Sequence, residues 1–420
     1  MDRVLSEKPL NAEPSLQSLS SSFLTPTKNV FNRNHGEIPF SKDTATYSLS
    51  IRAEVPSITL DKTLTYDELE KYEKVEVICA LACAGNRRSE MHEEKDVEGL
   101  LWGGSAIANS HFTGPLLREV LAQLGIDLQK VQNADNMHIH FETSQKCEDA
   151  EFYGSSLPLA MALDPERPVL LATHMNGETL DEKHGKPCRL VVPGIIGARS
   201  VKWLERIIIR DRPSDNFYMT RDYKILPPDT TPETKEEDLK HVPPMMELPL
   251  NSEICEPRDS SSIELGQNER SLRVRGYALG AKGTPIASVK VALVPLPLPE
   301  SSSLSSSNNE PEHPELYRIR LSASKLPQDQ WIETELVDRP PNETAKRESN
   351  EKVWGWTLFS TTLAVPSDLI EQAKKKDVQV ALVAYATDTN GQRQELQTPY
   401  NLRGVAEASW TVSRIRLRAA

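Results

Sequence analysis

The sequence predicts an α+β protein: a mixed α/β domain followed by an immunoglobulin-like β-sandwich. Two observations predict this. Strand patterns alternate with an amphipathic helix in the first half, and the last third carries evenly spaced short strands. A polar, proline-rich stretch over residues 227–244 separates them. With 420 residues, 30 prolines and 38% hydrophobic residues, the chain suits a loop-rich protein of two domains better than a helical bundle.

The clearest strand is predicted over residues 75–83, where apolar side chains alternate at Val75, Val77, Cys79, Leu81 and Cys83. Gly85 provides the backbone freedom to end the strand, and Arg87 and Arg88 follow. A thiol at a strand end beside two guanidiniums can hold a metal next to an anionic ligand. From this stretch alone, an ordinary buried cysteine is the favoured explanation of Cys83.

A helix is predicted over residues 115–125, because Leu116, Leu117, Val120, Leu121 and Leu124 form one stripe and Gly125 ends it. Strands resume from His138, and a strand over 169–175 leads into Asn176-Gly177, a strong hairpin signal. His174 ends that strand, where a histidine is more often half-buried and structural than a ligand.

Two polar segments are candidates for binding. Phe31-Asn32-Arg33-Asn34-His35 concentrates hydrogen-bond donors, although a solvated turn would have the same composition. In residues 184–203, potentially cationic side chains interrupt an apolar, glycine-rich segment, as a buried phosphate would require; they are His184, Lys186, Arg189, Arg199 and Lys202. A strand pair with solvated basic edges is the alternative.

The predicted organisation has three parts: a flexible arm over 1–28, a catalytic domain over 29–245 and a sandwich over 246–420. A Ser-rich insertion near 298–313 is expected to be a disordered surface loop. The sandwich strands are predicted at 272–279, 288–294, 317–321, 354–359, 378–386 and 410–417.

Composition excludes several classes of function. The net charge is −12 and no long basic stripe is present, so nucleic acid is a poor candidate partner. No run of about 18 apolar residues exists, so no membrane span is expected. Five cysteines give no disulfide framework and fit a reducing compartment. Without a clear targeting signal, we expect a soluble intracellular protein, with cytoplasm, peroxisome and mitochondrion left open.

Several longer motifs together resemble the sulfite oxidase family of molybdenum enzymes, from about Leu24 to Leu417. Because no haem domain is expected, the chain resembles the haem-free, plant- or fungal-type members. The motifs are Cys-Ala-Gly-Asn-Arg-Arg-Ser-Glu-Met at 83–91, Arg-Asn-His at 33–35, His-Gly-x-Pro-x-Arg at 184–189, Val-Pro-Gly-Ile-Ile-Gly-Ala-Arg-Ser-Val-Lys-Trp-Leu at 192–204, Arg-Asp-Tyr-Lys at 221–224 and Asn-Leu-Arg-Gly-Val at 401–405.

This resemblance implies a sulfite-oxidase-type molybdopterin-binding domain in which Cys83 ligates molybdenum as a thiolate. The implied cofactor contacts are Phe31, Asn32, Arg33, Asn34, His35, Gln145, His184, Arg189, Ser200, Val201 and Lys202. Gln145 departs from the family, which usually has an aspartate there, and its amide adds no charge.

The resemblance also implies a sulfite pocket formed by Arg33, Arg88, Trp102, Tyr223 and Arg403. Guanidiniums suit a small oxyanion because they are permanently charged, planar and multidentate. In the family mechanism, the sulfur of sulfite attacks an oxo group of the Cys-ligated molybdenum, and sulfate leaves. The sandwich is implied to form a homodimer.

A second expectation concerns electron transfer. No cytochrome b5-type domain with its His-Pro-Gly-Gly signature is present, and no flavin domain, so we expect neither haem nor flavin. Electrons would then pass to oxygen or to a separate carrier.

Two alternatives remain. One is the molybdenum domain of a nitrate reductase, which usually has Lys-Glu-Gln where this chain has Ser89-Glu90-Met91. The other is a catalytically idle molybdopterin carrier or dimeric scaffold.

Overall fold

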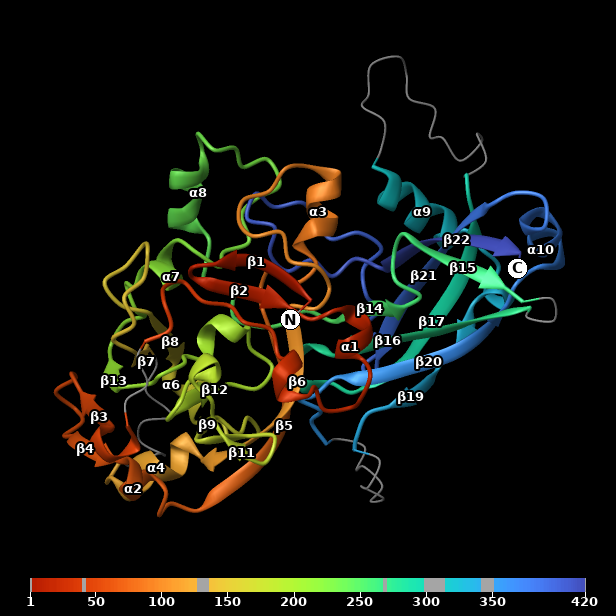
Figure 1. The fold of residues 1–420 in the computed structure, drawn as a ribbon. Coiled ribbons are helices and arrows are strands. Elements are labelled where there is room, and N and C mark those ends of the chain that lie inside the picture. The colour runs from red at the N-terminus through yellow and green to blue at the C-terminus, as the bar shows by residue number, and fades with distance from the viewer. Residues whose placement is uncertain are drawn as a thin grey trace.

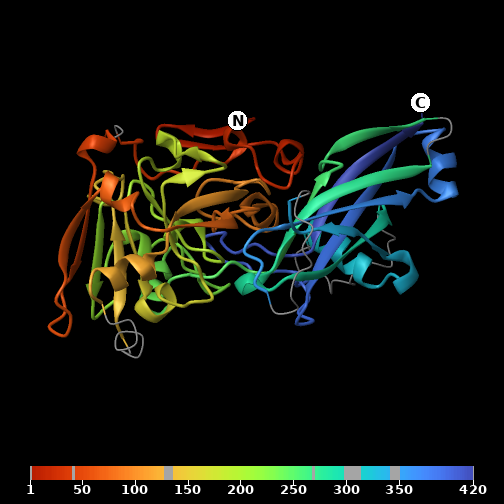
Figure 2. The same ribbon diagram turned by 90° about the horizontal axis from the view of Figure 1, so that it is seen from below.

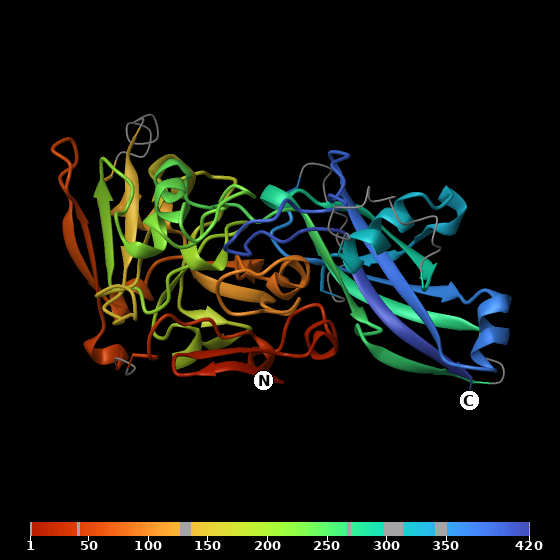
Figure 3. The same cartoon turned by 90° about the horizontal axis from the view of Figure 1, so that it is seen from above.

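The computed structural model describes residues 2–39, 43–126, 136–266, 270–297, 314–340 and 351–419. The fold has two halves that lie side by side, a mixed N-terminal half and a β-rich C-terminal half (Figure 1). The views from below and above show the same elongated arrangement (Figures 2 and 3). No helix among the described residues combines the length and apolar character needed to cross a membrane.

The first sheet of the N-terminal half has five strands in the order β4-β3-β13-β7-β8. Their bounds are β3 Ser48–Ala53, β4 Asp61–Thr65, β7 His138–Glu142, β8 Gly154–Pro158 and β13 Arg206–Arg210. β13 pairs in parallel with β3 and antiparallel with β7, so segments far apart in sequence form the centre of the sheet. The adjoining helices are α2 Tyr66–Leu69 and α6 Leu159–Ala162.

The second sheet has the order β11-β10-β6-β5, and a separate pair joins β12 to β9. The bounds are β5 Lys74–Ala82, β6 Ile107–Pro115, β9 Leu170–Ala172, β10 His174–Met175, β11 Glu178–Thr179 and β12 Arg189–Val191. β5 confirms the strand predicted over 75–83. Asn176 and Gly177 have φ of 53° and 83°, which confirms the predicted hairpin turn between β10 and β11.

The predicted helix over 115–125 is confirmed as α4, Leu117–Gln123. It buries Leu117, Val120 and Leu121 in the main core, as the apolar stripe requires. Pro115 is instead the last residue of β6. The remaining helices of this half are α3 Arg88–Glu94, α7 Phe217–Thr220 and α8 Lys235–His241, with short 3-10 turns at Thr27–Asn29, Thr44–Thr46, Glu182–His184 and Gly197–Arg199.

The prediction of a flexible arm over residues 1–28 is wrong for the described residues 2–28. They form β1 Arg3–Glu7, β2 Leu10–Glu13 and α1 Leu16–Leu19. Leu19 and Phe23 join the main hydrophobic core, and Asn11 and Glu13 are both 2% exposed. The composition misled the prediction, because these polar side chains are buried by partners that lie far along the chain.

The C-terminal half contains two facing sheets, in the orders β14-β16-β20-β19 and β15-β22-β21-β17-β18. Apolar side chains from both sheets form one core between them, including Val274, Phe359, Val289 and Leu382. The bounds are β14 Asn251–Glu256, β15 Ser261–Leu265, β16 Ser271–Leu279, β17 Ile286–Pro295, β18 Ile332–Glu333, β19 Glu335–Val337, β20 Thr357–Ala364, β21 Val378–Asp388 and β22 Thr411–Ala419.

One predicted strand of this half is wrong. Residues 317–321 lie in helix α9, Glu315–Ser324. The helix buries Leu316, Ile319, Arg320 and Ala323, which share one helical face. That face packs on β17, β21 and β22, outside the core between the sheets. Five alternating residues are too few to separate the two periods, and the contact with the sheet decided the outcome.

Further short elements of this half are α10 Ser367–Ala373 and 3-10 turns at Ala281–Gly283 and Gln328–Gln330. The predicted Ser-rich loop over 298–313 lies outside the described residues. The immunoglobulin-like topology and the domain boundary near residue 245 stay predictions.

Candidate active site

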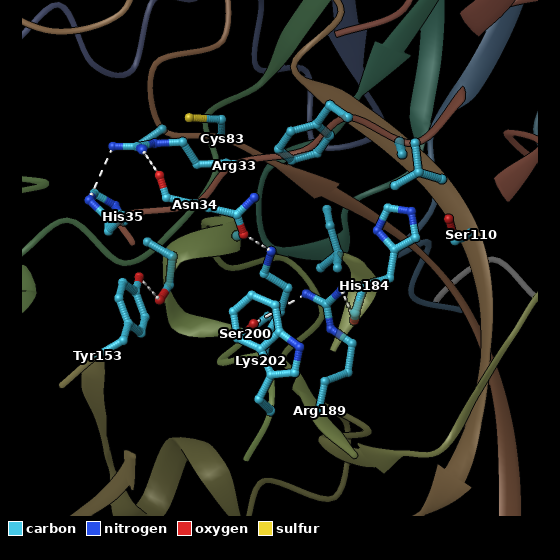
Figure 4. Close-up of a pocket in the computed structure, with 18 of the residues that line it drawn as sticks. Arg33, Asn34, His35, Cys83, Ser110, Tyr153, His184, Arg189, Ser200 and Lys202 are labelled. Carbon is cyan, nitrogen blue, oxygen red and sulfur yellow. Dashed lines mark hydrogen bonds between the residues drawn. The ribbon is translucent and has the colours of Figure 1, made fainter. Parts of the chain in front are cut away.

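A cavity in the N-terminal half brings together most of the residues predicted to bind a cofactor (Figure 4). Its empty volume, with the open solvent at its mouth included, is about 830 Å³. Of the predicted residues, those that line it are Phe31, Arg33, Asn34, His35, Cys83, Gln145, His184, Arg189, Ser200, Lys202 and Tyr223.

Cys83 follows β5, and its thiol borders this cavity beside Arg33 (Figure 4). The backbone N–H of Cys83 donates to Ala106 O at 2.8 Å, and its Sγ accepts from the N–H of Gly85 at 3.4 Å. Burial raises the pKa of the Cys83 thiol, and the nearby guanidiniums of Arg88 and Arg33 act in the opposite direction. Cys79, by contrast, is fully buried in an apolar cluster and is an ordinary core cysteine.

Beside the thiol, the loop carrying Arg33 and His35 is fixed by hydrogen bonds. Arg33 Nη2 lies 3.2 Å from His35 Nδ1, and His35 Nε2 lies 2.5 Å from the hydroxyl of Tyr223. A guanidinium only donates, so Nδ1 of His35 accepts; burial holds the pKa of His35 well below its ordinary value, so the ring is neutral. The proton on Nε2 therefore points at Tyr223, whose hydroxyl keeps its own proton for a ligand.

The far end of the cavity is cationic. Arg189 donates to the carbonyls of His184 at 3.1 Å and Ser200 at 3.2 Å, and Lys202 donates to Lys183 O at 3.1 Å and to Asn34 Oδ1. Among the residues that the structure describes, neither cation forms an ion pair, and Arg189 Nε is buried without a hydrogen-bond partner.

The electrostatics of this end call for an anion. Burial lowers the pKa of Arg189 to about 10, that of Lys202 well below its ordinary value and that of His184 to about 4. Each lowered pKa means that the protein's own groups do not fully balance the charged form of that side chain. A buried phosphate would supply it, so the donor set fits a phosphate-bearing cofactor whose other end reaches Cys83.

The backbone of this end also requires a glycine. Gly185 has a φ of 108°, and a Cβ there would lie 3.1 Å from the Cβ atoms of Arg189 and Lys202. A larger residue would therefore be strained at this position and would crowd the residues that carry the two cations.

Three further predicted cofactor contacts, Gln145, Asn32 and Val201, differ in their position relative to the cavity. Gln145 Nε2 donates to the carbonyls of Gly36 at 3.1 Å and Glu37 at 3.0 Å, so this amide fastens the loop beside His35. Asn32 and Val201 are buried but do not line the cavity. Asn32 pairs with Ala12 through two backbone hydrogen bonds of 3.0 and 2.8 Å.

Three of the five residues predicted to receive substrate do not line the cavity. Trp102 is fully buried and packs with Cys83. Arg88 donates to Gly404 O at 3.0 Å and to Leu100 O at 2.9 Å. Arg403, from the C-terminal half, pairs with Asp222 and with Glu98 at 3.1 Å. Arg33 and Tyr223 do line the cavity.

The structure adds residues that the sequence did not single out. Asp222 and Glu98 hold Arg403, and Tyr153, Ser110 and Trp203 line the cavity. Asp222 stands inside the Arg-Asp-Tyr-Lys motif, so the motif itself pointed to it. Trp203 likewise stands inside the motif at 192–204, whereas Glu98, Tyr153 and Ser110 carry no local signal, because their roles depend on partners distant in sequence.

Two family profiles match the chain. The oxidoreductase molybdopterin binding domain matches residues 35–218, and the Mo-co oxidoreductase dimerisation domain matches residues 242–295. The first spans the lining of the cavity from His35 to Lys202. The second begins at the end of α8 and extends into the C-terminal half.

Curated relatives cover nearly the whole chain. The sulfite oxidase of Arabidopsis thaliana is 31% identical over 418 residues, covering 99% of this chain and 94% of its own length. The mitochondrial sulfite oxidase of Rattus norvegicus is 33% identical over 408 residues, and the chain spans 64% of its length. The nitrate reductase [NADPH] of Aspergillus niger is 34% identical over 301 residues, covering 69% of this chain and 33% of that protein.

A solved structure shares the fold. The sulfane dehydrogenase SoxCD of Paracoccus pantotrophus superposes with a TM-score of 0.68 at 20% identity, covering 98% of this chain and 85% of that chain. The full-length similarity to the plant protein and the cavity with its molybdopterin-binding profile lead to one conclusion: this chain is an oxidoreductase that belongs to the sulfite oxidase family, with a molybdopterin-binding domain and a dimerisation domain.

Proposed function

We propose that this protein oxidises sulfite to sulfate with a molybdenum-molybdopterin cofactor. One observation carries the proposal: a single cavity has the Cys83 thiol at one end and two cations at the other, the buried Arg189 and the half-buried Lys202. A cofactor with a phosphate and a thiolate-ligated metal satisfies both ends at once. The names of the plant and animal relatives agree with sulfite as the substrate.

The cofactor would be held along the whole cavity. Arg189, Lys202 and His184 would bind the phosphate, Cys83 would ligate the metal, and the segments carrying Phe31 to His35, Gln145 and Ser200 would flank the pterin. When bound, the cofactor supplies the two-electron redox chemistry that amino-acid side chains lack.

The side chains of the protein would bind and orient the substrate anion. Arg33 presents a permanent charge beside Cys83, and the Tyr223 hydroxyl is free to donate a hydrogen bond to an oxygen of sulfite or of the departing sulfate. Arg88 and Arg403 add positive charge behind the wall, where Glu98 and Asp222 partly neutralise Arg403.

The overall reaction needs an electron acceptor. Conversion of sulfite and water into sulfate releases two protons and two electrons. We propose that this chain binds neither haem nor flavin, and that the electrons pass to oxygen or to a separate carrier. The dimerisation profile supports a homodimer.

The test combines metal analysis with turnover. Purified protein should contain molybdenum, and sulfite should reduce at least one acceptor among oxygen, ferricyanide and cytochrome c. Nitrate reduction serves as the control, because the Aspergillus niger nitrate reductase is 34% identical over part of the chain. Nitrate turnover without sulfite turnover would replace the proposal by the nitrate reductase alternative, and a molybdenum-loaded protein without either activity would indicate a cofactor carrier.

A further inference from the structure

We propose that the β1–β2 hairpin is a clamp on the active site, and that Asn11 is a positioning residue for Arg33 and Asn34. The hairpin lies on one outer face of the N-terminal half, close to the chain start (Figures 2 and 3). Asn11 and Glu13 of β2 are nevertheless 2% exposed, because Asn11 contacts the cavity-lining loop of Arg33 and Asn34, and Glu13 contacts the segment around Trp102 that packs behind Cys83. As far as it concerns sulfite, the inference rests on the proposed function.

Asn11 contacts the loop of Arg33 and Asn34 through its side chain. Its Oδ1 accepts from Arg33 Nη1 at 3.2 Å and from the backbone N–H of Asn34 at 2.9 Å. Its Nδ2 donates to Pro9 O at 3.0 Å, which fixes the orientation of the amide. One oxygen atom thus orients the guanidinium of Arg33 and the backbone that follows it.

The contacts continue from Asn34 to the cationic end of the cavity. Asn34 Nδ2 donates to Leu10 O at 2.6 Å, and its Oδ1 accepts from Lys202 Nζ. Figure 4 shows Asn34 between Arg33 and Lys202, with a dashed bond to each. The hairpin is therefore connected to the residue beside Cys83 and to the residue at the phosphate end.

Glu13 holds the segment of Gly103 and Ser105, next to Trp102. Its carboxylate accepts from the N–H of Gly103 at 3.0 and 3.1 Å and from Ser105 Oγ at 3.2 Å, and it pairs with Arg3 at 2.8 Å. Gly103 O in turn accepts from the N–H of Arg87 at 2.8 Å. This segment carries Trp102, which packs with Cys83, so one hairpin contacts both the loop of Arg33 and the segment behind the thiol.

The chemistry of Asn11 suits positioning of a substrate-binding cation. A buried guanidinium needs acceptors to hold its direction. A carboxylate in this place would orient Arg33 but cancel its charge, whereas an amide oxygen orients it and leaves the charge available for an anion. The loss of Asn11 should therefore loosen the Arg33 loop. Its replacement by Asp loses the donor to Pro9 O but should keep the acceptor for Arg33 and for the N–H of Asn34, while weakening anion binding.

Amide hydrogen exchange tests this without relying on activity, because the N–H of Asn34 bonds directly to Asn11. We would measure exchange over residues 31–36 in the purified wild-type protein and in Asn11→Ala, Asn11→Asp and Ser6→Ala. Ser6→Ala is the matched control, since Ser6 Oγ donates to Pro9 O at 2.8 Å within the same hairpin, and Ser6 is not among the described residues that line the cavity. Sulfite KM and kcat would be measured on the molybdenum-loaded forms.

For Asn11→Ala we expect about tenfold faster exchange at Asn34 and about a tenfold rise in sulfite KM. This is the size of effect expected when one hydrogen bond is lost. Asn11→Asp should restore slow exchange while KM stays raised, and Ser6→Ala should match the wild type in both. If Asn11→Ala fails to fold, the separation of exchange from KM in Asn11→Asp carries the test.

Wild-type exchange at Asn34 in Asn11→Ala would overturn the inference. Equal acceleration in Ser6→Ala, or an unchanged KM in Asn11→Asp, would overturn it too. A wild-type protein that binds molybdenum but does not oxidise sulfite would contradict only the proposed function, because the exchange measurement still tests the clamp.

Discussion

Replacing Arg189 by Met separates the role of its charge from its role in the fold. Burial lowers the pKa of Arg189 from 12.5 to about 10, which corresponds to about 3 kcal/mol for keeping the guanidinium charged inside the folded, cofactor-free protein. This cost applies in full below about pH 10, because there the side chain is charged in both the folded and the unfolded chain. At neutral pH the cofactor-free protein therefore contains a destabilising charge.

The substitution has opposite effects in the cofactor-free protein. Removing the charge relieves about 3 kcal/mol, while the carbonyls of His184 and Ser200 lose their donors at about 1–3 kcal/mol each. The net change in the free energy of unfolding should therefore be small or moderately destabilising. In the loaded protein the cofactor phosphate already balances the charge, so nothing is relieved and a charged hydrogen bond to the phosphate is lost.

The difference in stability between the loaded and cofactor-free forms should then shrink by about 3 kcal/mol, which equals about a hundredfold loss of cofactor affinity. The assay is the molybdenum-to-protein ratio after repeated gel filtration, together with urea unfolding of both forms. Arg206→Met is the matched control, because Arg206 pairs with Glu142 at 2.8 Å and lies outside the cavity lining. Equal destabilisation of both forms by Arg189→Met, or full retention of molybdenum, would refute the reasoning.

Four further outcomes are expected. Cys83→Ser should abolish sulfite-dependent ferricyanide reduction, and retained turnover would contradict thiolate ligation. Glu98→Gln should lower sulfite KM about fivefold, because Arg403 loses a competing anion at 3.1 Å worth about 1 kcal/mol; Glu237→Gln on the surface of α8 is the control for steady-state kinetics. The cofactor-free protein should lose stability as pH falls from 6.5 towards 4, since burial lowers the pKa of His184 to about 4 and the unfolded chain takes up the proton first. In urea unfolding, His184→Gln should reduce this loss of stability between pH 6.5 and 4. An unchanged loss of stability would exclude His184 as its source. Ile319→Ala should reduce the free energy of unfolding by about 2–4 kcal/mol, because Ile319 is fully buried where α9 covers the sheet; a change near zero would contradict that packing.

Local patterns predicted much of the fold. The strand over 75–83, the helix around Val120 and the hairpin turn at Asn176-Gly177 were all found where side-chain period or turn chemistry indicated them. Each depends on residues within about ten positions, so neighbouring side chains alone specify it. The alternating segment around Ile319 is too short for that rule, and its contact with β17 and β21 made it a helix.

Sequence by itself also determined the family and the two ends of the cavity, because Cys83 and the cations after His184 stand in long ordered motifs. Only the tertiary structure decided which of the arginines face the cavity. Arg33 does, whereas Arg403 is paired with Asp222, 181 residues away, and Arg88 with the carbonyl of Gly404. It also decided that residues 2–13 form a hairpin whose residues 11–13 are buried, and not an arm. The physical reason is that periodicity records which side of an element is buried, while the partner of a buried polar group is chosen by chain segments that meet only after folding.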